Sequence, residues 1–179
     1  DGKDETDETD ETDGKTHLKY KTLVNKYGTK LTHLINYLNQ IFKSGDNRVI
    51  IFSQYDRLLK MIGKVLNDFH IQHIYLKGNV NVVSKNIMKF KTDNKIRVIM
   101  LSSDKCSSGN NLTEANYIIF MDILNEEKQQ TKEIESQAIG RAVRLGQNRP
   151  VTIKRFIMRY TIEEEYFKKN RYNMDELQF

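Results

Sequence analysis

Apolar residues recur three and four positions apart in three stretches of this chain, which is the spacing of one buried helix face. The stretches cover residues 31–42, 58–69 and 81–90. Gly45 and Asp46 follow the first stretch and are typical of a helix end. The spacing therefore predicts three amphipathic helices.

Short apolar runs, most of them continuous and rich in β-branched residues, follow these helices and are typical of strands buried in a parallel sheet. A fourth helical pattern covers residues 131–146, with Gly146 suited to end it. Strands alternating with helices predict an α/β fold of three layers, with a mainly parallel sheet flanked by helices. The predicted strands are residues 48–54, 71–76, 96–102, 116–122 and 151–158.

The formal net charge of +5 conceals an asymmetry along the chain. Residues 1–15 hold eight of the 24 acidic and two of the 29 basic residues, so the remainder carries 27 bases against 16 acids. A body this basic favours a polyanion such as nucleic acid, although many proteins with a basic balance bind none.

The first 16 residues repeat Asp-Glu-Thr three times and contain no apolar side chain, so we expect an acidic disordered tail or linker. Gly14-Lys15-Thr16 mimics the end of a phosphate-binding loop. That loop also needs a glycine at position 9, which is Thr9, so we reject the match.

Several kinds of protein are excluded by composition. No apolar run approaches the roughly 20 residues of a membrane span, and the acidic N-terminus does not resemble a signal peptide. Cys106 is the single cysteine, which excludes an internal disulfide or a cysteine-rich zinc site. We therefore expect an intracellular protein with no membrane partner and no metal site of its own.

In open parallel sheets, ligands gather beyond the carboxyl ends of the strands. The loop after the third predicted strand, residues 102–111, is rich in Ser, Gly and Asn. Such small side chains let backbone amides approach phosphate oxygens closely. A flexible surface loop without a ligand would have the same composition.

Residues 135–147 read E-S-Q-A-I-G-R-A-V-R-L-G-Q and place two arginines on the fourth predicted helix. At about 100° per residue, Gln137, Arg141 and Arg144 project in nearly one direction. Two guanidinium groups one turn apart can clamp a phosphoryl group. Alternatively, the arginines pair with carboxylates on a solvated face, those of Glu133, Glu135 or Glu163. The side chains expected to face the core are Ile134, Ala138 and Leu145.

The same stretch closely resembles the last motif of Swi/Snf-type helicase-like ATPases of superfamily 2, E-x-Q-A-x-G-R-x-x-R-x-G-Q, at every fixed position. Four further segments resemble the family's other motifs in the family's order. They are K-L-T-H-L-I-N-Y-L at residues 30–38, V-I-I-F-S-Q-Y at 49–55, S-S-G-N-N-L-T-E-A-N-Y-I-I-F-M-D at 107–122 and T-I-E-E-E-Y-F at 161–167. The resemblance covers about residues 28–168 and leaves 169–179 as a C-terminal extension.

The resemblance implies a C-terminal RecA-like lobe of a two-lobed motor that hydrolyses ATP with Mg²⁺ between its lobes. Arg141 and Arg144 would be arginine fingers supported by Gln137. They would reach a nucleotide bound mainly by the N-terminal lobe of the same protein, which is absent from this chain. Gly109 and Asn111 would line the nucleotide side of the cleft.

The resemblance also implies movement along double-stranded DNA, the family's partner. It places Ser53, Gln54, Ser102 and Lys105 where the second lobe of the family meets the DNA backbone. The chain departs from the family's L-D-G-S turn at residues 76–79, where Lys77 replaces the acid. Lys77 therefore adds a positive charge toward such a partner.

Two other segments depart from the family pattern. Where the family has A-G-G-V-G-L-N-L-T, residues 105–113 read K-C-S-S-G-N-N-L-T, so Cys106 and Ser107 replace two glycines. The family's D-P-x-W-N-P segment is missing from residues 122–130. Similar substitutions in homologues suggest a version of the family from large DNA viruses.

Two functions remain compatible with the sequence. The first is one lobe of an ATP-dependent DNA translocase or chromatin remodeller, which we expect to be inactive alone and to act in a nucleus or at a viral replication site. The second is a binding module that keeps the fold and basic surface without catalysis, which the altered glycine loop favours. The presence of both arginines favours the first.

Overall fold

The computed structural model describes residues 18–102, 111–123 and 128–170. The chain divides into two compact units, Asp1–Lys43 and Ser44–Phe179. The predicted tail at residues 1–16 and the extension beyond residue 170 lie outside the described part of the chain.

The first unit contains two helices that meet at Gly28. The predicted helix is α2, Thr29–Lys43, and its apolar face is buried as the spacing indicates. A further helix covers residues 18–27 and precedes every element that we predicted. Gly28 separates the two helices with a φ of +82°, a conformation that glycine adopts without steric cost.

The second unit is built on a five-stranded sheet, and every pair of neighbouring strands is parallel. The strand order is β2-β3-β1-β4-β5, so the sequence starts in the middle of the sheet and adds strands to both sides. All five predicted strands are confirmed, each with shorter bounds. They are β1 (Val49–Ser53), β2 (His73–Tyr75), β3 (Val98–Ser102), β4 (Tyr117–Phe120) and β5 (Thr152–Arg155).

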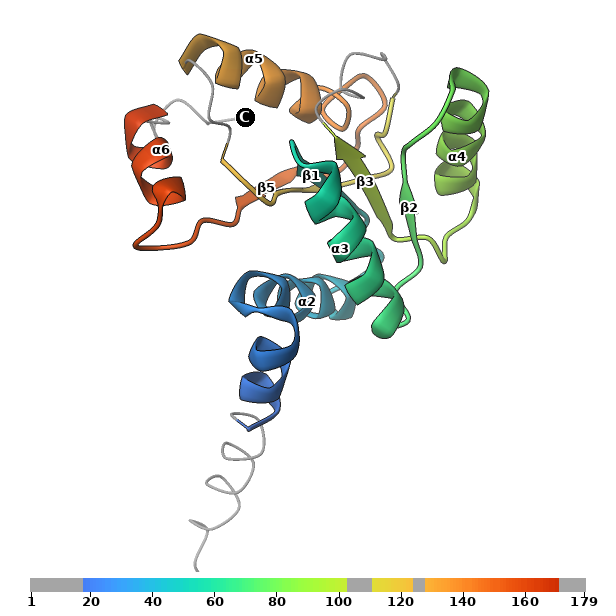
Figure 1. Ribbon diagram of the computed structural model, residues 1–179. Helices are drawn as coiled ribbons and strands as arrows, with labels where there is room; N and C mark the ends of the chain where they lie inside the picture. Colours follow the sequence, from blue (N-terminus) through green and yellow to red (C-terminus); the bar gives the residue numbers. More distant parts are fainter. Residues whose placement is uncertain (1–17, 103–110, 124–127, 171–179) are drawn as a thin grey trace, which may run out of the picture. The chain divides into compact units, whose positions relative to one another are not determined.

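Within the described residues of this unit, four helices accompany the sheet. Figure 1 shows α3 in front of the strands, α4 beside β2 and α5 beyond the end of β3 to which its arrowhead points. The bounds are α3 (Asp56–Asp68), α4 (Val80–Thr92), α5 (Lys128–Ile139) and α6 (Ile162–Asn170).

Alternate residues along the strands face two different helix layers. Ile50 and Phe52 share one buried cluster with side chains of α4 and α5. Met100 faces α3 on the other side, where a Cβ added at Gly63 would lie 3.4 Å from the methionine methyl carbon. The expected three-layer α/β fold is confirmed, because helices cover both faces of the parallel sheet.

The fourth predicted helix is shorter than its sequence pattern. We expected it to continue to Gly146, but α5 ends at Ile139 and residues 140–146 form successive turns. Leu145, expected in the core, is 96% exposed. The arginines of this segment therefore lie on a turn rather than on one helix face.

None of the helices in the described ranges is long and apolar enough to cross a membrane.

Candidate functional site

Arg141 and Arg144 lie in the turn that follows α5, and the turn gives them different surroundings. Arg141 is buried, with 4% of its surface exposed, whereas Arg144 and Gln137 are exposed. The predicted common direction of these three side chains is wrong, because it assumed a helix through residue 146.

Two glycines and one long-range bond shape this turn. Gly140 lies so close to the preceding helical turn that a Cβ there would approach the Ser136 carbonyl oxygen to 3.1 Å. Gly146 has a φ of +100°, which favours glycine. Between them, the Arg141 carbonyl accepts a hydrogen bond from the Leu112 amide at 2.8 Å. The carbonyl thus pairs with a segment 29 positions earlier instead of continuing the helix.

Gln147 ties this turn to the segment before β4. Its Nε2 lies 3.0, 2.8 and 3.2 Å from the carbonyl oxygens of Thr113, Ala115 and Ala142. Its Oε1 accepts from the Arg149 amide at 3.0 Å. One amide group therefore joins three stretches of backbone.

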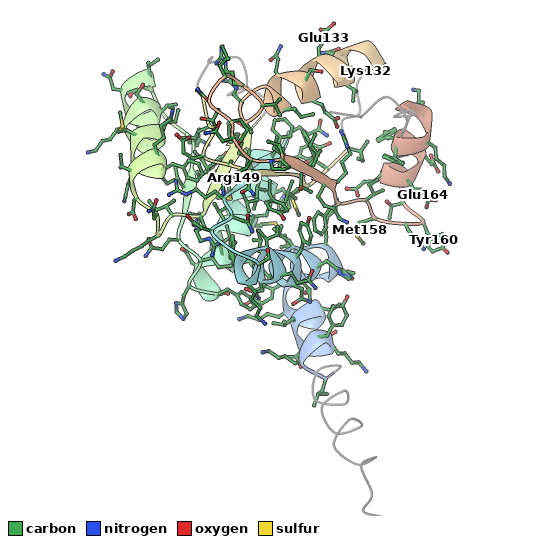
Figure 2. All side chains as sticks on the ribbon, turned by 180° about the vertical axis from the view of Figure 1, so that it is seen from behind. Lys132, Glu133, Arg149, Met158, Tyr160 and Glu164 are labelled. Carbon is green, nitrogen blue, oxygen red and sulfur yellow. The ribbon has the colours of Figure 1, made fainter. Side chains whose placement is uncertain are left out.

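An open groove of about 380 Å³ lies beside the turn. Arg144, Gln147 and Arg149 contribute polar groups to it, and Arg149 is labelled in Figure 2. The remaining lining is apolar, from Val143, Pro150, Val151 and Ile153.

Helix α5 is anchored by an ion pair at the side of the sheet. The Arg155 guanidinium on β5 reaches both carboxylate oxygens of Glu135, with its terminal nitrogen at 2.6 Å, and lies 5.3 Å from the centre of the Phe120 ring. Both side chains are largely buried, so the pair holds α5 beside β4 and β5. Lys132 and Glu133 point away on the outer side of the helix (Figure 2).

Three of the residues implied in DNA contacts lie at the carboxyl ends of adjacent strands, as the sheet topology requires. Ser53 and Ser102 end β1 and β3 and are neighbours in the strand register. Ser102 is buried, and Gln54 directly follows β1 and is partly buried.

Asp122, which follows β4, organises this edge and was not among the predicted site residues. Its carboxylate accepts from the Ser53 hydroxyl and from the Gln54 amide, the latter at 3.3 Å. The Gln54 side chain donates to the Ile123 carbonyl at 3.1 Å. Ser53 is 0% exposed, and a fully buried side chain cannot also contact a DNA backbone in this conformation. The geometry therefore does not support Ser53 as a direct DNA contact.

Lys77 lies beyond the carboxyl end of β2 and has a carboxylate partner. Its Nζ lies 2.7 Å from Oδ2 of Asp56, the first residue of α3, and the Tyr75 hydroxyl donates to the same carboxylate. The hydrogen bonds from Lys77 and then Tyr75 hold the pKa of Asp56 below its ordinary value. About half of the Lys77 side chain is exposed, so the ammonium group remains within reach of solvent.

Two predicted site residues lie outside the described part of the chain. They are Gly109, predicted at the nucleotide, and Lys105, predicted at the DNA backbone. Asn111 is partly buried, and its side-chain oxygen accepts from the Thr113 amide at 3.2 Å, which forms a local turn before β4. Across residues 18–102, 111–123 and 128–170, no group of three metal-ligating side chains comes together.

The opposite, amino-end edge of the sheet contains arginines that bind backbone carbonyls. The guanidinium of Arg48 donates to the Phe90 carbonyl and to the Asn94 side chain, both at 2.5 Å. Arg97 donates to the Asn47 carbonyl at 2.9 Å. These side chains have structural partners, and burial lowers the pKa of Arg97.

Two sequence signals could have identified the roles of Glu135, Gln147 and Asp122. Glu135 and Gln147 are fixed positions of the arginine motif; Glu135 was expected only as a possible partner of Arg141 or Arg144, and Gln147 had no expected role. Asp122 directly follows a predicted strand, which is the position where ligands and catalytic groups gather in parallel sheets.

The described geometry matches that of known proteins. The model of the helicase conserved C-terminal domain family matches residues 29–146. The chain belongs to this family. Its relatives are of the Swi/Snf type within superfamily 2, as the motifs predicted.

Two relatives and one solved structure illustrate the similarity. Helicase SWR1 of Mycosarcoma maydis is 33% identical over 137 residues, 75% of this chain and 7% of that protein. DNA repair protein rad8 of Schizosaccharomyces pombe is 32% identical over 154 residues, 84% of this chain and 13% of that protein. The crystal structure of the C-terminal part of the Fun30 ATPase domain covers 89% of this chain and 54% of its own, at 26% identity and a TM-score of 0.73.

These comparisons confirm the predicted RecA-like α/β fold of a helicase C-terminal lobe. The chain spans a small part of its curated relatives. The suggested viral version of the family stays a prediction.

Proposed function

We propose that this chain is the C-terminal lobe of a Swi/Snf-type ATP-dependent double-stranded DNA translocase, and that residues 28–168 form this lobe. The acidic residues 1–16 would be a tail or linker and residues 169–179 an extension. The observation that carries the proposal is the turn after α5. In this turn the Arg144 side chain is exposed, and hydrogen bonds from other residues of the lobe hold the backbone around it in place.

Arg144 has the chemistry that a phosphate requires, because its planar guanidinium offers several charged donors to oxygen. Bound ATP with Mg²⁺, held mainly by the N-terminal lobe, would supply the phosphoryl group that is transferred to water. Arg144 would stabilise the negative charge that develops on that group. Arg141 is buried beside it, where its positive charge is less screened by water and acts over a longer range.

The other predicted nucleotide-site residues have supporting roles in this proposal. Gln137 is exposed on α5, two positions after the anchored Glu135 and three before the turn begins at Gly140. Asn111 and Gly109 would line the nucleotide side of the cleft. In this arrangement the lobe completes a shared site and has no activity by itself.

The DNA partner would lie across the carboxyl ends of β1, β2 and β3. Gln54 and Lys77 are at least partly exposed there, and Ser102 ends β3 at the same edge. Lys105, three positions later in the sequence, would join them. Contacts of this kind with phosphates give affinity without reading the base sequence. Rad8, one of the relatives, is a DNA repair protein, which supports a DNA partner. The lobe would act in a nucleus or at a viral replication site.

The test is steady-state ATP hydrolysis by the longest natural chain that contains this lobe, with and without double-stranded DNA. Arg144→Ala and Arg141→Ala should lower DNA-stimulated turnover by about 10³-fold or more, the range for arginine fingers. Arg159→Ala, an exposed arginine before α6, is the matched control and should leave turnover unchanged.

Folding and DNA affinity are measured for every variant before turnover is compared. If both finger variants hydrolyse ATP like the unmodified chain, the translocase proposal fails. The lobe would then be a binding module that retains the fold without catalysis.

A further inference from the structure

Gln147 has more structural partners than its position at the end of an exposed turn would suggest. Besides the three carbonyls within reach of its Nε2, its own backbone amide donates to the Arg144 carbonyl at 3.0 Å. The residue therefore bonds the backbone of Ala142 and of Arg144, on either side of Val143. The segment that carries both arginines is closed into a loop by a single residue.

The same side chain reaches the segment that follows the serine- and asparagine-rich loop. Thr113 and Ala115 accept from it, and the neighbouring Leu112 amide donates to the Arg141 carbonyl at 2.8 Å. Asn111, which the resemblance places at the nucleotide, lies one residue before Leu112. Gln147 thus fixes the backbone that carries the arginines relative to the segment that begins with Asn111.

An amide is the side chain that this position requires. Glutamine provides donor hydrogens and an acceptor oxygen at one tip, and both are used here, since Oε1 accepts from the Arg149 amide at 3.0 Å. Glutamate would direct a charged oxygen at three carbonyl oxygens. Methionine has a similar length but cannot donate.

We propose that Gln147 is a positioning residue for catalysis, which holds the arginine-bearing turn in the geometry that Arg144 needs. This inference rests on the proposed function. Catalytic groups are sensitive to such support, because a displacement of about 1 Å can lower the rate about 10²-fold.

The test is a double-mutant cycle in DNA-stimulated ATP hydrolysis by the longest natural chain containing the lobe. Gln147→Met should lower kcat by about tenfold to a hundredfold and leave the KM for ATP and the DNA affinity unchanged. On an Arg144→Ala background, Gln147→Met should lower kcat no further, because its effect acts through that arginine. Gln40→Met, at an exposed glutamine of α2, is the matched control.

All rates are measured below the unfolding temperature of each variant, determined by circular dichroism. If Gln147→Met does not fold, Gln147→Asn replaces it in the same cycle, because it keeps the amide and shortens its reach by one methylene.

Each result has one meaning. An equal loss in both backgrounds, or an unchanged kcat in the single variant, overturns the positioning role. If Arg144→Ala itself leaves kcat unchanged, the proposed function has failed instead, and the two failures are thereby distinguished.

Discussion

The amino-end edge of the sheet and the turn after α5 both contain arginines, but the two regions use the side chain differently. At the amino-end edge, Arg48, Arg97 and Arg149 direct their guanidinium groups at backbone carbonyls. Arg97 and Arg149 thereby satisfy carbonyls just before the strands, and Arg48 satisfies a carbonyl in the last turn of α4. These arginines act as framework.

In the turn after α5 the backbone is fixed by other groups. Leu112 and Gln147 supply the hydrogen bonds to the carbonyls of Arg141, Ala142 and Arg144. These backbone carbonyls are thus held by groups other than guanidinium, whereas at the amino-end edge guanidinium groups themselves hold the backbone.

The strongest test of this distinction is to remove one arginine from each region. Arg48→Met loses bonds to Phe90 and Asn94 and its stacking 5.3 Å from the Phe90 ring. It should lower the free energy of unfolding by about 3 kcal/mol, since bonds from a buried charged group are lost. Arg144→Ala should change it by less than about 0.5 kcal/mol, as for most exposed positions.

Urea unfolding of the 179-residue chain measures both values. The distinction is wrong if Arg144→Ala destabilises the fold as much as Arg48→Met does.

A smaller effect is expected at Arg149, which is exposed although it belongs to the framework. Its guanidinium donates to the carbonyls of Asp46 at 2.7 Å and Glu114 at 2.5 Å. Arg149→Met should cost about 1 kcal/mol of unfolding free energy, because water can replace part of what is lost. Arg149→Lys should recover part of this unfolding free energy, because lysine can still donate to one of the two carbonyls, Asp46 or Glu114. Equal stability of the unmodified and Arg149→Met chains in urea would remove Arg149 from the framework.

The smallest expected effect concerns the ion pair between Lys77 and Asp56, beyond the carboxyl end of β2. The pKa of Asp56 is lowered in the folded state by Lys77 and Tyr75, so the carboxylate stabilises the fold above its unfolded pKa of about 3.9. This stabilisation is lost as the pH falls through the pKa of Asp56 in the folded state, which is lower than its pKa in the unfolded state. Because both side chains are about half exposed, Asp56→Asn should cost less than about 1 kcal/mol at pH 7.

Thermal unfolding of the unmodified and Asp56→Asn chains between pH 7 and pH 2 measures this difference. A difference in stability that grows toward low pH would contradict the assigned sign.

Most of the fold could be predicted because local pattern and final structure agree. The apolar runs became strands, and the helical spacing became α2, α3 and α4. The helix at residues 18–27 could also have been predicted, since Tyr20, Leu23, Val24 and Tyr27 have helical spacing and form its less exposed face.

The parts that could not be predicted depend on contacts far apart in sequence. The periodicity of α5 continues past Ile139, but the helix ends where the Arg141 carbonyl meets the Leu112 amide. The burial of Ser53 depends on Asp122, 69 positions later. Tertiary bonds of this kind override local propensity, so the sequence indicated the site residues without their geometry.

The two outer strands of the sheet have a consequence for the behaviour of the lobe in concentrated solution. Each pairs on one side only, which in a longer apolar strand would invite pairing with another molecule. β2 is three residues long, and β5 is four residues long and carries the exposed Lys154. Such short strands offer few backbone groups to a second copy, and a lysine on an edge strand opposes pairing. These features disfavour edge-to-edge aggregation of the sheet.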